Sequence, residues 1–413
     1  MGMSEEPLRG LLKKHFGYDQ FRPLQNEIIS QVVAGNDALV LMPTGGGKSI
    51  CFQLPALYFG GLTLVVSPLI SLMKDQVDAL TANGIRAAFI NSSLPPSEIE
   101  AIMAQAMRGD LKLLYAAPER LALDQFQHFL QSLELSLIAI DEAHCISEWG
   151  HDFRPDYRNL SSLRATFPGV PLLALTATAT ERVRRDIISQ LWLRAQKTFL
   201  ASFNRPNLYY RVLPKENAFY QLVALLRKYP NEPAIVYCFS RRDTEALAAE
   251  LCEAGFSALP YHAGIDAARR KETQEKFIRD EVPVIVATIA FGMGIDKPDV
   301  RLIVHYHLPK SIEGYYQETG RAGRDGLPSE CVLLYAAGDA RKHAYFIDQI
   351  ADNRARANAY AKLDQVVRYC ELKTCRRAFL LRYFGETHGA SCDACDRCQP
   401  AAKTAGARAV AQN

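Results

Sequence analysis

The sequence has little excess charge of either sign. Its 48 lysine and arginine residues nearly balance 45 aspartate and glutamate residues, so the formal net charge of the 413-residue chain is +3. An excess this small does not by itself indicate a polyanionic partner, but its distribution is uneven. Residues 336–413 contain 13 basic and 8 acidic residues. Basic charge is therefore concentrated near the C-terminal end.

The sequence also lacks a hydrophobic run suited to crossing a membrane. An uncharged run from Ser49 to Met73 is long enough, but Pro55, a glycine pair and Pro68 interrupt it. We interpret this run as helix, turn, strand and turn. The acidic N-terminus shows no apolar segment typical of a secretory signal. We therefore expect a cytoplasmic protein without a membrane partner.

Short apolar runs alternate with helical stretches in two successive blocks, which is typical of parallel sheets covered on both faces. A polar, proline-containing segment at residues 203–207 separates the blocks. We predict an α/β protein with one lobe at residues 1–203 and a second at 204–336. A helical, cysteine-rich module is expected at 337–400, with a disordered tail at 401–413. The predicted strands are residues 38–41, 62–66, 111–116, 135–140 and 171–175, followed by 234–239, 257–261, 284–287, 300–306 and 331–335.

A glycine-rich loop follows the first predicted strand, in the sequence Met42-Pro43-Thr44-Gly45-Gly46-Gly47-Lys48-Ser49. A strand, a glycine loop and a helix in this order form a phosphate cradle, because backbone N–H groups and the helix N-terminus converge on phosphate oxygens. Lys48 is expected to reach the β- and γ-phosphates, and the Ser49 hydroxyl to hold Mg²⁺. The strict pattern requires glycine where this chain has Met42. A purely structural turn is the alternative interpretation.

An acidic pair, Asp141-Glu142, follows the predicted strand at residues 135–140 and precedes Ala143-His144. Ligands of open α/β sheets bind at the carboxyl ends of the strands. There, Asp141 is suited to hold Mg²⁺ together with Ser49, and Glu142 to orient or deprotonate an attacking water. The alternative is an acidic pair that only caps the following helix.

The phosphate loop and the DEAH sequence together resemble the core of superfamily 2 helicases. Phe16-Gly17-Tyr18 and Phe21-Arg22-Pro23-Leu24-Gln25 resemble the motif that precedes this loop in the RecQ family of DNA helicases. The resemblance implies that ATP is the nucleotide, selected by Gln25 through its amide. It also implies two tandem RecA-like lobes. The implied nucleotide-binding residues are Tyr18, Arg22, Gln25, Thr44, Gly45, Gly46, Gly47, Lys48, Ser49 and Asp296.

The loop after DEAH contains aromatic residues among polar ones, in Ser147-Glu148-Trp149-Gly150-His151-Asp152-Phe153-Arg154-Pro155. This loop resembles the aromatic-rich loop that couples single-stranded DNA to ATP hydrolysis in RecQ enzymes. Stacking of a base on an aromatic ring is worth about 1–3 kcal/mol. Trp149, Phe153 and Arg154 are therefore predicted to couple DNA binding to hydrolysis. The alternative is that Trp149 and Phe153 pack beneath the loop as core.

In the second block, Gln317, Arg321 and Arg324 belong to a sequence that resembles the final motif of superfamily 2 helicases. We predict that the two arginines project from one face of a helix. The resemblance implies that they reach the γ-phosphate, where an arginine contributes about 10³–10⁵-fold in rate. The alternative is a surface ion pair. Residues 284–301 also resemble RecQ proteins, whereas His262 alone is more typical of a structural histidine.

Ten cysteines without a secretory signal indicate reduced thiols or a metal site. Cys392, Cys395 and Cys398 form a compact triplet, and sixteen residues separate Cys375 from it. Four thiolates suit structural zinc, and the triplet spacing also suits an iron–sulfur cluster. The RecQ resemblance favours zinc, with Cys370 or His388 as substitute ligands. The other cysteines are expected to pack in apolar surroundings: Cys51, Cys145, Cys238, Cys252 and Cys331.

We therefore predict a RecQ-type, ATP-dependent DNA helicase that moves 3′ to 5′ on single strands and unwinds duplexes in DNA repair or recombination. The expected cofactors are ATP, Mg²⁺ and Zn²⁺, and the expected partners are single-stranded and partially duplex DNA. We expect a monomer in the bacterial cytoplasm, at the nucleoid rather than in a eukaryotic nucleus. An RNA-directed helicase and a non-enzymatic nucleic-acid-binding scaffold are the alternatives.

Overall fold

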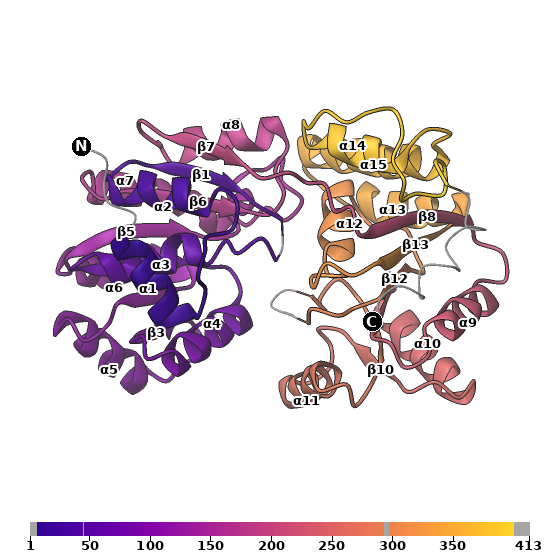
Figure 1. The fold of residues 1–413 in the computed structure, drawn as a ribbon, viewed down its shortest axis with the longest axis horizontal. Helices are drawn as coiled ribbons and strands as arrows, with labels where there is room; N and C mark the ends of the chain where they lie inside the picture. The colour runs from indigo at the N-terminus through magenta and orange to yellow at the C-terminus, as the bar shows by residue number, and fades with distance from the viewer. Residues whose placement is uncertain (1–5, 44, 293–296, 400–413) are drawn as a thin grey trace. The chain divides into compact units, whose positions relative to one another are not determined.

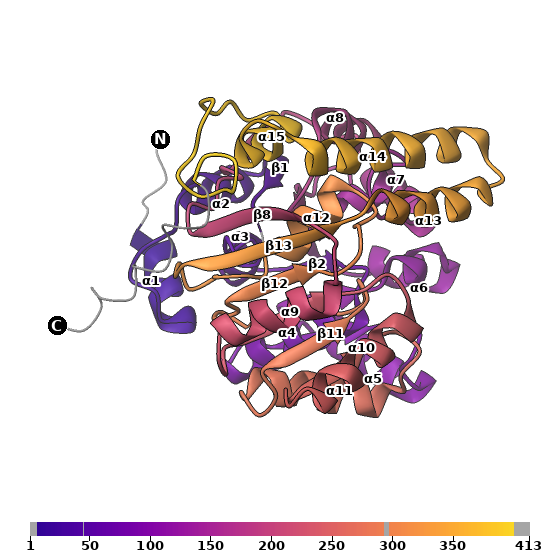
Figure 2. The same ribbon diagram turned by 90° about the vertical axis from the view of Figure 1, so that its right-hand side faces the viewer.

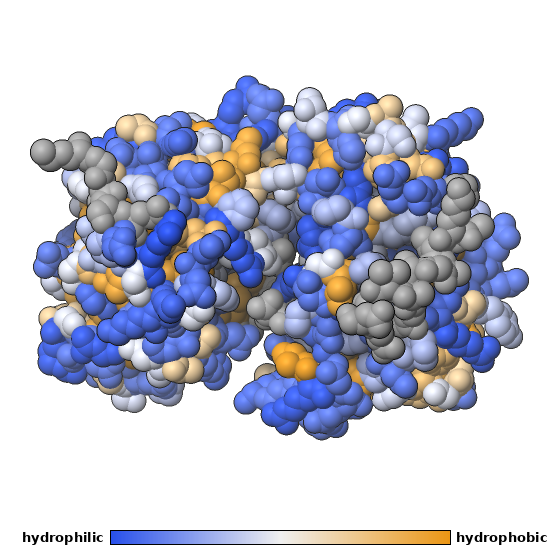
Figure 3. Space-filling model, in the orientation of Figure 1, coloured by the Kyte–Doolittle hydropathy of each residue, from blue (hydrophilic) through white to orange (hydrophobic). Residues whose placement is uncertain are grey.

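The computed structural model describes residues 6–43, 45–292 and 297–399 of the chain. The chain divides into two compact units between Ser202 and Phe203, and each unit is considered by itself (Figure 1). Within the described ranges, no helix is long and apolar enough to cross a membrane. The visible face is mostly hydrophilic, with apolar residues scattered among polar ones (Figure 3).

The first unit is built on a seven-stranded sheet in the order β3-β4-β2-β5-β6-β1-β7, in which all pairs are parallel. Its central strands are buried on both faces because helices cover both sides. The strands are β1 (Ala38–Leu41), β2 (Leu62–Val66), β3 (Ala87–Ile90), β4 (Leu113–Ala116), β5 (Leu135–Ile140), β6 (Leu172–Thr176) and β7 (Lys197–Leu200).

Helices α2, α3 and α4 pack against one face of this sheet. Residues such as Ile28, Phe52 and Met73 meet alternate strand residues there, as the two-residue period of a strand requires. The helices are α1 (Glu6–Phe16), α2 (Gln25–Val33), α3 (Ile50–Tyr58), α4 (Ile70–Ala82), α5 (Pro96–Met107), α6 (Asp124–Gln131), α7 (Ser161–Thr166) and α8 (Glu181–Gln190). Three 3₁₀ turns are η1 (Pro118–Ala122), η2 (Ala143–Ile146) and η3 (Pro155–Leu160).

The second unit contains a six-stranded parallel sheet in the order β10-β11-β9-β12-β13-β8. One face packs against α9 and α10, and the other against α11, α12 and the helices that follow. The strands are β8 (Leu208–Pro214), β9 (Ala234–Tyr237), β10 (Ala258–Tyr261), β11 (Val284–Ala287), β12 (Leu302–His305) and β13 (Ser329–Tyr335). The helices are α9 (Ala218–Lys228), α10 (Arg241–Glu253), α11 (Ala267–Ile278) and α12 (Ile312–Thr319).

The chain after β13 is helical and shares its core with the sheet of the second unit. It forms α13 (Ala337–Asp348), α14 (Asn353–Glu371) and α15 (Arg376–Tyr383). Tyr369 of α14 packs against Tyr315 of α12, with ring centroids 5.1 Å apart. Helices α14 and α15 lie beside β8 in both views (Figure 1 and Figure 2). The hydrophobic core of this region is therefore continuous with that of the second unit.

The predicted fold class of two parallel-sheet α/β lobes followed by a helical segment is confirmed. Three strands were not predicted, namely β3, β7 and β8. Both β3 and β7 are four-residue strands at or next to a sheet edge, and β7 buries only Phe199. Thr44, Asp296 and the tail at residues 401–413 lie outside the described residues.

Candidate functional site

The phosphate loop leads from the buried end of β1 into α3, and its glycines are required by the backbone. Gly45 and Gly47 have φ angles of +81° and +84°, in the region that favours glycine. A Cβ atom on Gly47 would lie 2.5 Å from Nε2 of Gln25. The Gly46 N–H donates a 2.9 Å hydrogen bond to the Pro43 carbonyl. This tight loop brings backbone groups together in front of the N-terminus of α3.

Gln25 and Arg22 hold the loop from the preceding segment. The Gln25 amide donates to the Gly47 carbonyl at 3.0 Å and accepts from the Arg22 N–H at 2.8 Å. The Arg22 guanidinium donates to the Gly45 carbonyl at 2.6 Å. Lys48 Nζ donates to the Met42 carbonyl at 3.0 Å. Residues predicted to bind nucleotide are therefore brought together around the loop, with Tyr18 exposed nearby in sequence.

Asp141 and Glu142 follow β5 at the carboxyl edge of the same sheet. The Asp141 N–H donates to the Val66 carbonyl, and the Tyr157 hydroxyl donates to the Asp141 carbonyl, both at 2.9 Å. Glu142 has a φ angle of +47°, an uncommon conformation for a residue with a side chain. Its N–H donates to Asp141 Oδ1 at 2.9 Å. The backbone is thus held so that both carboxylates stand at the strand end.

The two carboxylates differ in their electrostatic surroundings. Burial, with a contribution from the Glu142 carboxylate, raises the pKa of Asp141 to about 6, while the Lys48 cation acts in the opposite direction. Burial also opposes ionisation of Glu142. Hydrogen bonding and the charge of His144 outweigh that effect and hold the pKa of Glu142 well below its usual range. Lys48 acts electrostatically on both carboxylates, in agreement with the position of the loop and the acidic pair at one edge of the sheet.

His144 connects the acidic pair to the segment after β6. Its Nδ1 lies 2.8 Å from Thr176 Oγ1 and 3.2 Å from Glu142 Oε2. Thr176 Oγ1 in turn accepts from the Thr178 N–H at 3.2 Å. The ring of His144 also stacks on that of His151, with centroids 4.3 Å apart. The end of β6 and the loop after η2 therefore both contact the DEAH segment.

The aromatic loop is half-buried and does not form core. Arg182 of α8 covers the Trp149 ring at 3.1 Å from its centroid, and Arg158 lies 5.0 Å from the Phe153 centroid. Arg154 donates to Asp152 at 3.1 and 3.2 Å and to the Pro68 carbonyl at 3.0 Å. An open hollow beside Trp149 is lined by Trp149, Arg182, Arg185, Asp186 and Ser189.

Arg182 was missed in the sequence because its contact with Trp149 joins residues far apart in the chain. The only local signal is the basic run Arg182-Val183-Arg184-Arg185 at the start of a helix. Arginine is suited both to stack on aromatic rings and to bind phosphate. The hollow beside Trp149 therefore combines an aromatic face with two guanidinium groups.

Two predictions about ordinary packing cysteines are wrong. Cys145 is buried, but its Sγ lies 3.7 Å from His144 Nε2 and 3.8 Å from Asp152 Oδ2 rather than in apolar surroundings. The reason is the tight η2 turn, which brings neighbouring polar side chains together. Cys252 is exposed, because it lies on the outer face of α10.

In the second unit, the predicted helical placement of the two arginines is wrong. Helix α12 contains Gln317 but ends at Thr319, so Arg321 and Arg324 lie in the turn that follows it. Gly323 has a φ angle of +52°, which a helix cannot accommodate. Arg321 is buried and donates to the Gly292 carbonyl. His262 is also buried, with Glu245 and the Gly264 N–H as partners of its ring nitrogens.

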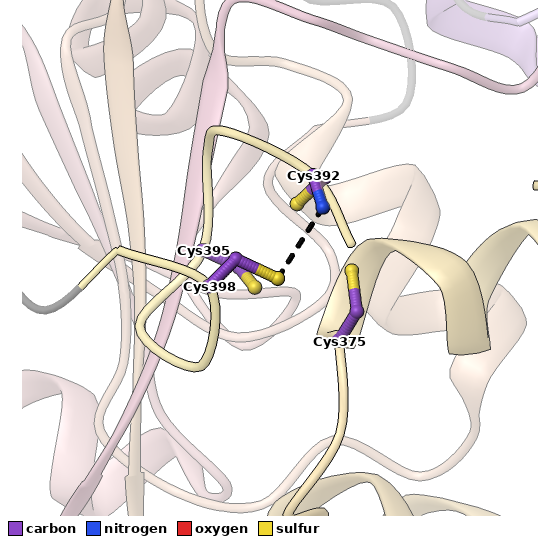
Figure 4. Close-up of side chains that lie close together, drawn as sticks. All are labelled: Cys375, Cys392, Cys395 and Cys398. Carbon is purple, nitrogen blue, oxygen red and sulfur yellow. Dashed lines mark hydrogen bonds between the residues drawn. The ribbon is translucent and has the colours of Figure 1, made fainter. Parts of the chain in front are cut away.

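Cys375, Cys392, Cys395 and Cys398 converge on one point, with their Sγ atoms all within 4.8 Å of one another (Figure 4). Cys375 caps the N-terminus of α15, where its sulfur accepts from the Ala378 N–H at 3.4 Å. Four convergent thiols match the donor set of a closed zinc site. Neither Cys370 nor His388 belongs to this cluster in the described part of the chain.

Comparison with known proteins identifies the family. Residues 22–187 match the DEAD/DEAH box helicase family, and residues 215–326 match the helicase conserved C-terminal domain. Residues 337–399 match the RecQ zinc-binding family. The chain belongs to the RecQ helicase family. This last match favours zinc over an iron–sulfur cluster at the four cysteines.

Two relatives match nearly the whole of this chain. The chain is 48% identical over 384 residues to an ATP-dependent DNA helicase RecQ of Pasteurella multocida, covering 93% of this chain but 61% of that protein. It is 44% identical to a putative ATP-dependent RNA helicase, R290, of Acanthamoeba polyphaga mimivirus, covering 95% of this chain and 72% of that one. Among solved structures, Mss116p bound to ssRNA and AMP-PNP is similar in fold, with a TM-score of 0.69 at 16% identity over 94% of this chain and 91% of Mss116p.

Proposed function

We propose that this RecQ-family chain is an ATP-dependent DNA helicase that translocates 3′ to 5′ on single-stranded DNA and unwinds duplexes during repair or recombination. One observation carries the proposal. The glycine loop with Lys48 and the Asp141–Glu142 pair lie at the carboxyl edge of one parallel sheet and interact electrostatically. This edge is where α/β proteins bind phosphate ligands.

The proposed chemistry is hydrolysis of ATP with Mg²⁺. The loop N–H groups and Lys48 would bind the phosphates, and Ser49 with Asp141 would hold the metal ion, which neutralises charge on the transferred phosphoryl group. The lowered pKa of Glu142 favours its ionised form, whose carboxylate would orient or deprotonate water. Arg321 and Arg324 are assigned to stabilise charge during transfer. Gln25, with Tyr18 and Arg22, would select adenine when its amide leaves the Gly47 carbonyl.

The proposed coupling to DNA runs through the aromatic loop. A base stacking on Trp149 would displace the Arg182 guanidinium, which then remains available for a backbone phosphate. Movement of the aromatic loop on DNA binding would be transmitted to the acidic pair through residues that are in contact. Asp152 contacts Cys145, Cys145 contacts His144, and His144 lies beside Glu142.

The four cysteines are proposed to hold Zn²⁺ as a structural ion, with no part in hydrolysis. The convergence of four sulfur atoms supports this assignment. Because the Pasteurella multocida relative is a bacterial DNA helicase, we further propose a location at the nucleoid in the bacterial cytoplasm.

The decisive experiment compares ATP hydrolysis by the wild type and Trp149→Ala, with and without single-stranded DNA, at low and high salt. We expect DNA to stimulate the wild type, the stimulation to weaken with salt because phosphate contacts release counterions, and Trp149→Ala to lose it. Trp192→Ala is the matched control, since Trp192 is an exposed tryptophan of the same unit and is not among the residues that line the hollow beside Trp149. Equal stimulation of wild type and Trp149→Ala would reject the proposed coupling.

An RNA-directed helicase is the second candidate, because one relative bears the name of a putative RNA helicase. Replacing DNA by RNA of the same sequence in the assay separates the two candidates. Hydrolysis stimulated by RNA alone would favour the second candidate. A non-enzymatic scaffold would instead show the same activities in wild type and Lys48→Ala.

A further inference from the structure

Three potential metal ligands meet behind the DEAH segment, apart from the four-cysteine cluster. They are the Nε2 atom of His144, the Sγ atom of Cys145 and a carboxylate oxygen of Asp152, which all lie within 4.8 Å of one another. His144 and Cys145 are buried in η2, whereas Asp152 belongs to the aromatic loop and is partly exposed. The cluster therefore joins a rigid turn to a surface loop.

The spacing of these atoms suits a tetrahedral ion. The Sγ atom lies 3.7 Å from His144 Nε2 and 3.8 Å from Asp152 Oδ2. Zinc bonds of about 2.3 Å to sulfur and about 2.0–2.2 Å to nitrogen and oxygen give tetrahedral edges of about 3.5 Å. Both measured edges are within a few tenths of an ångström of that value. The same two distances are also compatible with hydrogen bonds that involve sulfur.

The second nitrogen of His144 is already oriented for metal binding. Thr176 Oγ1 donates to the Thr178 carbonyl at 3.3 Å, so it accepts from His144 Nδ1 at 2.8 Å. With Nδ1 as the donor in these contacts, loss of the other ring proton leaves the lone pair on Nε2, which faces Cys145. Ligating histidines commonly have a carboxylate or hydroxyl beside the other nitrogen, and Glu142 also lies 3.2 Å from Nδ1.

The proposed ligand Asp152 is held in position by Arg154. Arg154 donates to Asp152 Oδ2 through Nε and Nη2, and its Nη1 donates to the Pro68 carbonyl. A thiolate and a carboxylate would together neutralise a divalent ion, and the adjacent Arg154 cation and Glu142 carboxylate are of opposite charge. One sulfur, one imidazole nitrogen and one carboxylate favour Zn²⁺ or Co²⁺ over Mg²⁺ or Ca²⁺.

We propose that His144, Cys145 and Asp152 form a second transition-metal site that takes Zn²⁺, with the fourth position open to water. Binding joins Sγ and Nε2 to the metal and releases the thiol proton and the second imidazolium proton to solvent. The ion would fasten the aromatic loop to the DEAH turn. A consequence that rests on the proposed function is that occupancy lowers DNA-stimulated hydrolysis, because the loop could no longer move.

Cobalt is the probe for the test, because a thiolate bound to Co²⁺ gives a charge-transfer absorption that Zn²⁺ does not. The full chain, holding one equivalent of zinc at the four-cysteine site, is titrated with Co²⁺ while release of that zinc is monitored. We expect about one equivalent of Co²⁺ to bind with this absorption and without zinc release, because a closed four-cysteine site retains its ion.

Variants locate the cobalt. Cys145→Ser should abolish the charge-transfer absorption, and Asp152→Asn should weaken binding about 10–100-fold, as loss of a partner at a metal site does. Cys252→Ser is the matched control, because the exposed Cys252 thiol is the obvious competitor for added metal. If circular dichroism shows that Cys145→Ser is misfolded, Asp152→Asn decides the question, since its side chain is partly exposed.

Absence of the absorption in the wild type, its persistence in folded Cys145→Ser, or unchanged affinity in Asp152→Asn would each overturn the proposal. Hydrolysis is assayed separately as the ratio of DNA-stimulated rates with and without added Zn²⁺. A chain that binds cobalt as expected but hydrolyses no ATP would reject the proposed function and leave the metal site standing. Hydrolysis of ATP without cobalt binding would reject the metal site and leave the proposed function standing.

Discussion

Glu142 shows how much a single backbone conformation determines at this site. Its φ angle of +47° turns the chain sharply after β5. The side chains of Asp141 and Glu142 therefore lie in different surroundings, although the two residues are adjacent in the sequence. Such a conformation costs about 1–3 kcal/mol in a residue with a side chain. The neighbouring hydrogen bonds of Asp141 and Tyr157 hold it in place.

Glu142→Gln should retain this geometry and lose the negative charge. We expect ATP hydrolysis to fall about 10²–10⁴-fold, the usual contribution of a general base, while nucleotide binding persists. Hydrolysis and equilibrium binding of a labelled nucleotide are measured in parallel. Glu148→Gln is the control, because that exposed carboxylate in the aromatic loop pairs with Arg158. Equal rates in wild type and Glu142→Gln would assign the base elsewhere.

Gly292 gives a second test at the residue scale. A Cβ atom there would lie 2.3 Å from Arg321 Cζ, so any larger residue must displace the guanidinium. Gly292→Ala should therefore lower hydrolysis toward the rate of Arg321→Ala, a loss of up to about 10³-fold. Gly338→Ala is the control, since a Cβ at Gly338 meets no atom within 4 Å. Full activity in Gly292→Ala would show that the position of Arg321 is unimportant.

At the scale of elements, Asp37 ties the start of β1 to α7, to the start of β6 and to the segment before β7. Its carboxylate pairs with buried Arg164 at 2.5 Å and accepts from the Leu172 and Arg194 N–H groups at 2.8 and 2.6 Å. Asp37→Ala would leave the guanidinium buried without its carboxylate. We expect the first unit to lose about 3–5 kcal/mol of its free energy of unfolding.

Urea unfolding followed by tryptophan fluorescence measures this loss, because both tryptophans lie in the first unit. Asp78→Ala is the control, since Asp78 forms an exposed pair with Lys74 that is worth roughly 0–1 kcal/mol. Similar midpoints for the two variants would mean that solvent or a rearrangement replaces the buried pair.

Metal removal should affect the cysteine loop more than the helices beside it. The sulfur atoms of Cys392, Cys395 and Cys398 lie in a loop without helix or strand, whereas Tyr369 of α14 and Leu380 of α15 are buried in the core of the second unit. We expect a strong chelator to raise amide hydrogen exchange across residues 385–399, while α14 stays protected. Exchange that rises equally in both would mean that the metal holds the whole module together.

At the scale of the whole molecule, the general architecture was predictable because buried parallel strands are continuous apolar runs. Predicted and observed bounds coincide for β1, β2, β5 and β11. Edge strands were not predictable, since β7 exposes three of its four residues and has no apolar run. The glycine loop and acidic pair were also visible locally, because their chemistry depends on adjacent residues.

Contacts between distant residues were not predictable from local patterns. The cover of Arg182 over Trp149 depends on how α8 packs near η2. Likewise, the sequence does not reveal that Gly323 has a positive φ angle, which a helix cannot accommodate. A glycine that merely flanks a helix would look the same in the sequence. Cys145 was predicted to pack in apolar surroundings. Its sulfur instead faces Asp152, which lies seven residues further along in the aromatic loop.

Acid should destabilise the second unit through His307. Burial and the nearby Lys215 cation lower the pKa of His307 to about 4, and its Nδ1 accepts from the Phe239 N–H at 3.3 Å. A histidine in the unfolded chain has a pKa of about 6.5. The neutral His307 side chain therefore stabilises the fold fully above that pH, and this stabilisation is lost as the pH falls toward about 4.

His307→Asn retains an acceptor that does not titrate in this range. Hydrogen exchange of β9 and β12 at about pH 7 and about pH 5 should show a smaller acid-induced loss of protection in the variant than in the wild type. Equal losses would assign the acid sensitivity to other groups.

The cysteine loop has a further consequence through its position against β8, the last strand of its sheet. Tyr210 bridges to Cys395 in parallel, with the Tyr210 N–H donating to the Ala394 carbonyl at 3.2 Å and the Asp396 N–H donating to the Tyr210 carbonyl at 3.0 Å. The loop thus occupies backbone groups that an exposed edge would offer to another chain. We therefore expect metal loading at the cysteines to protect this edge of the sheet from pairing with another chain.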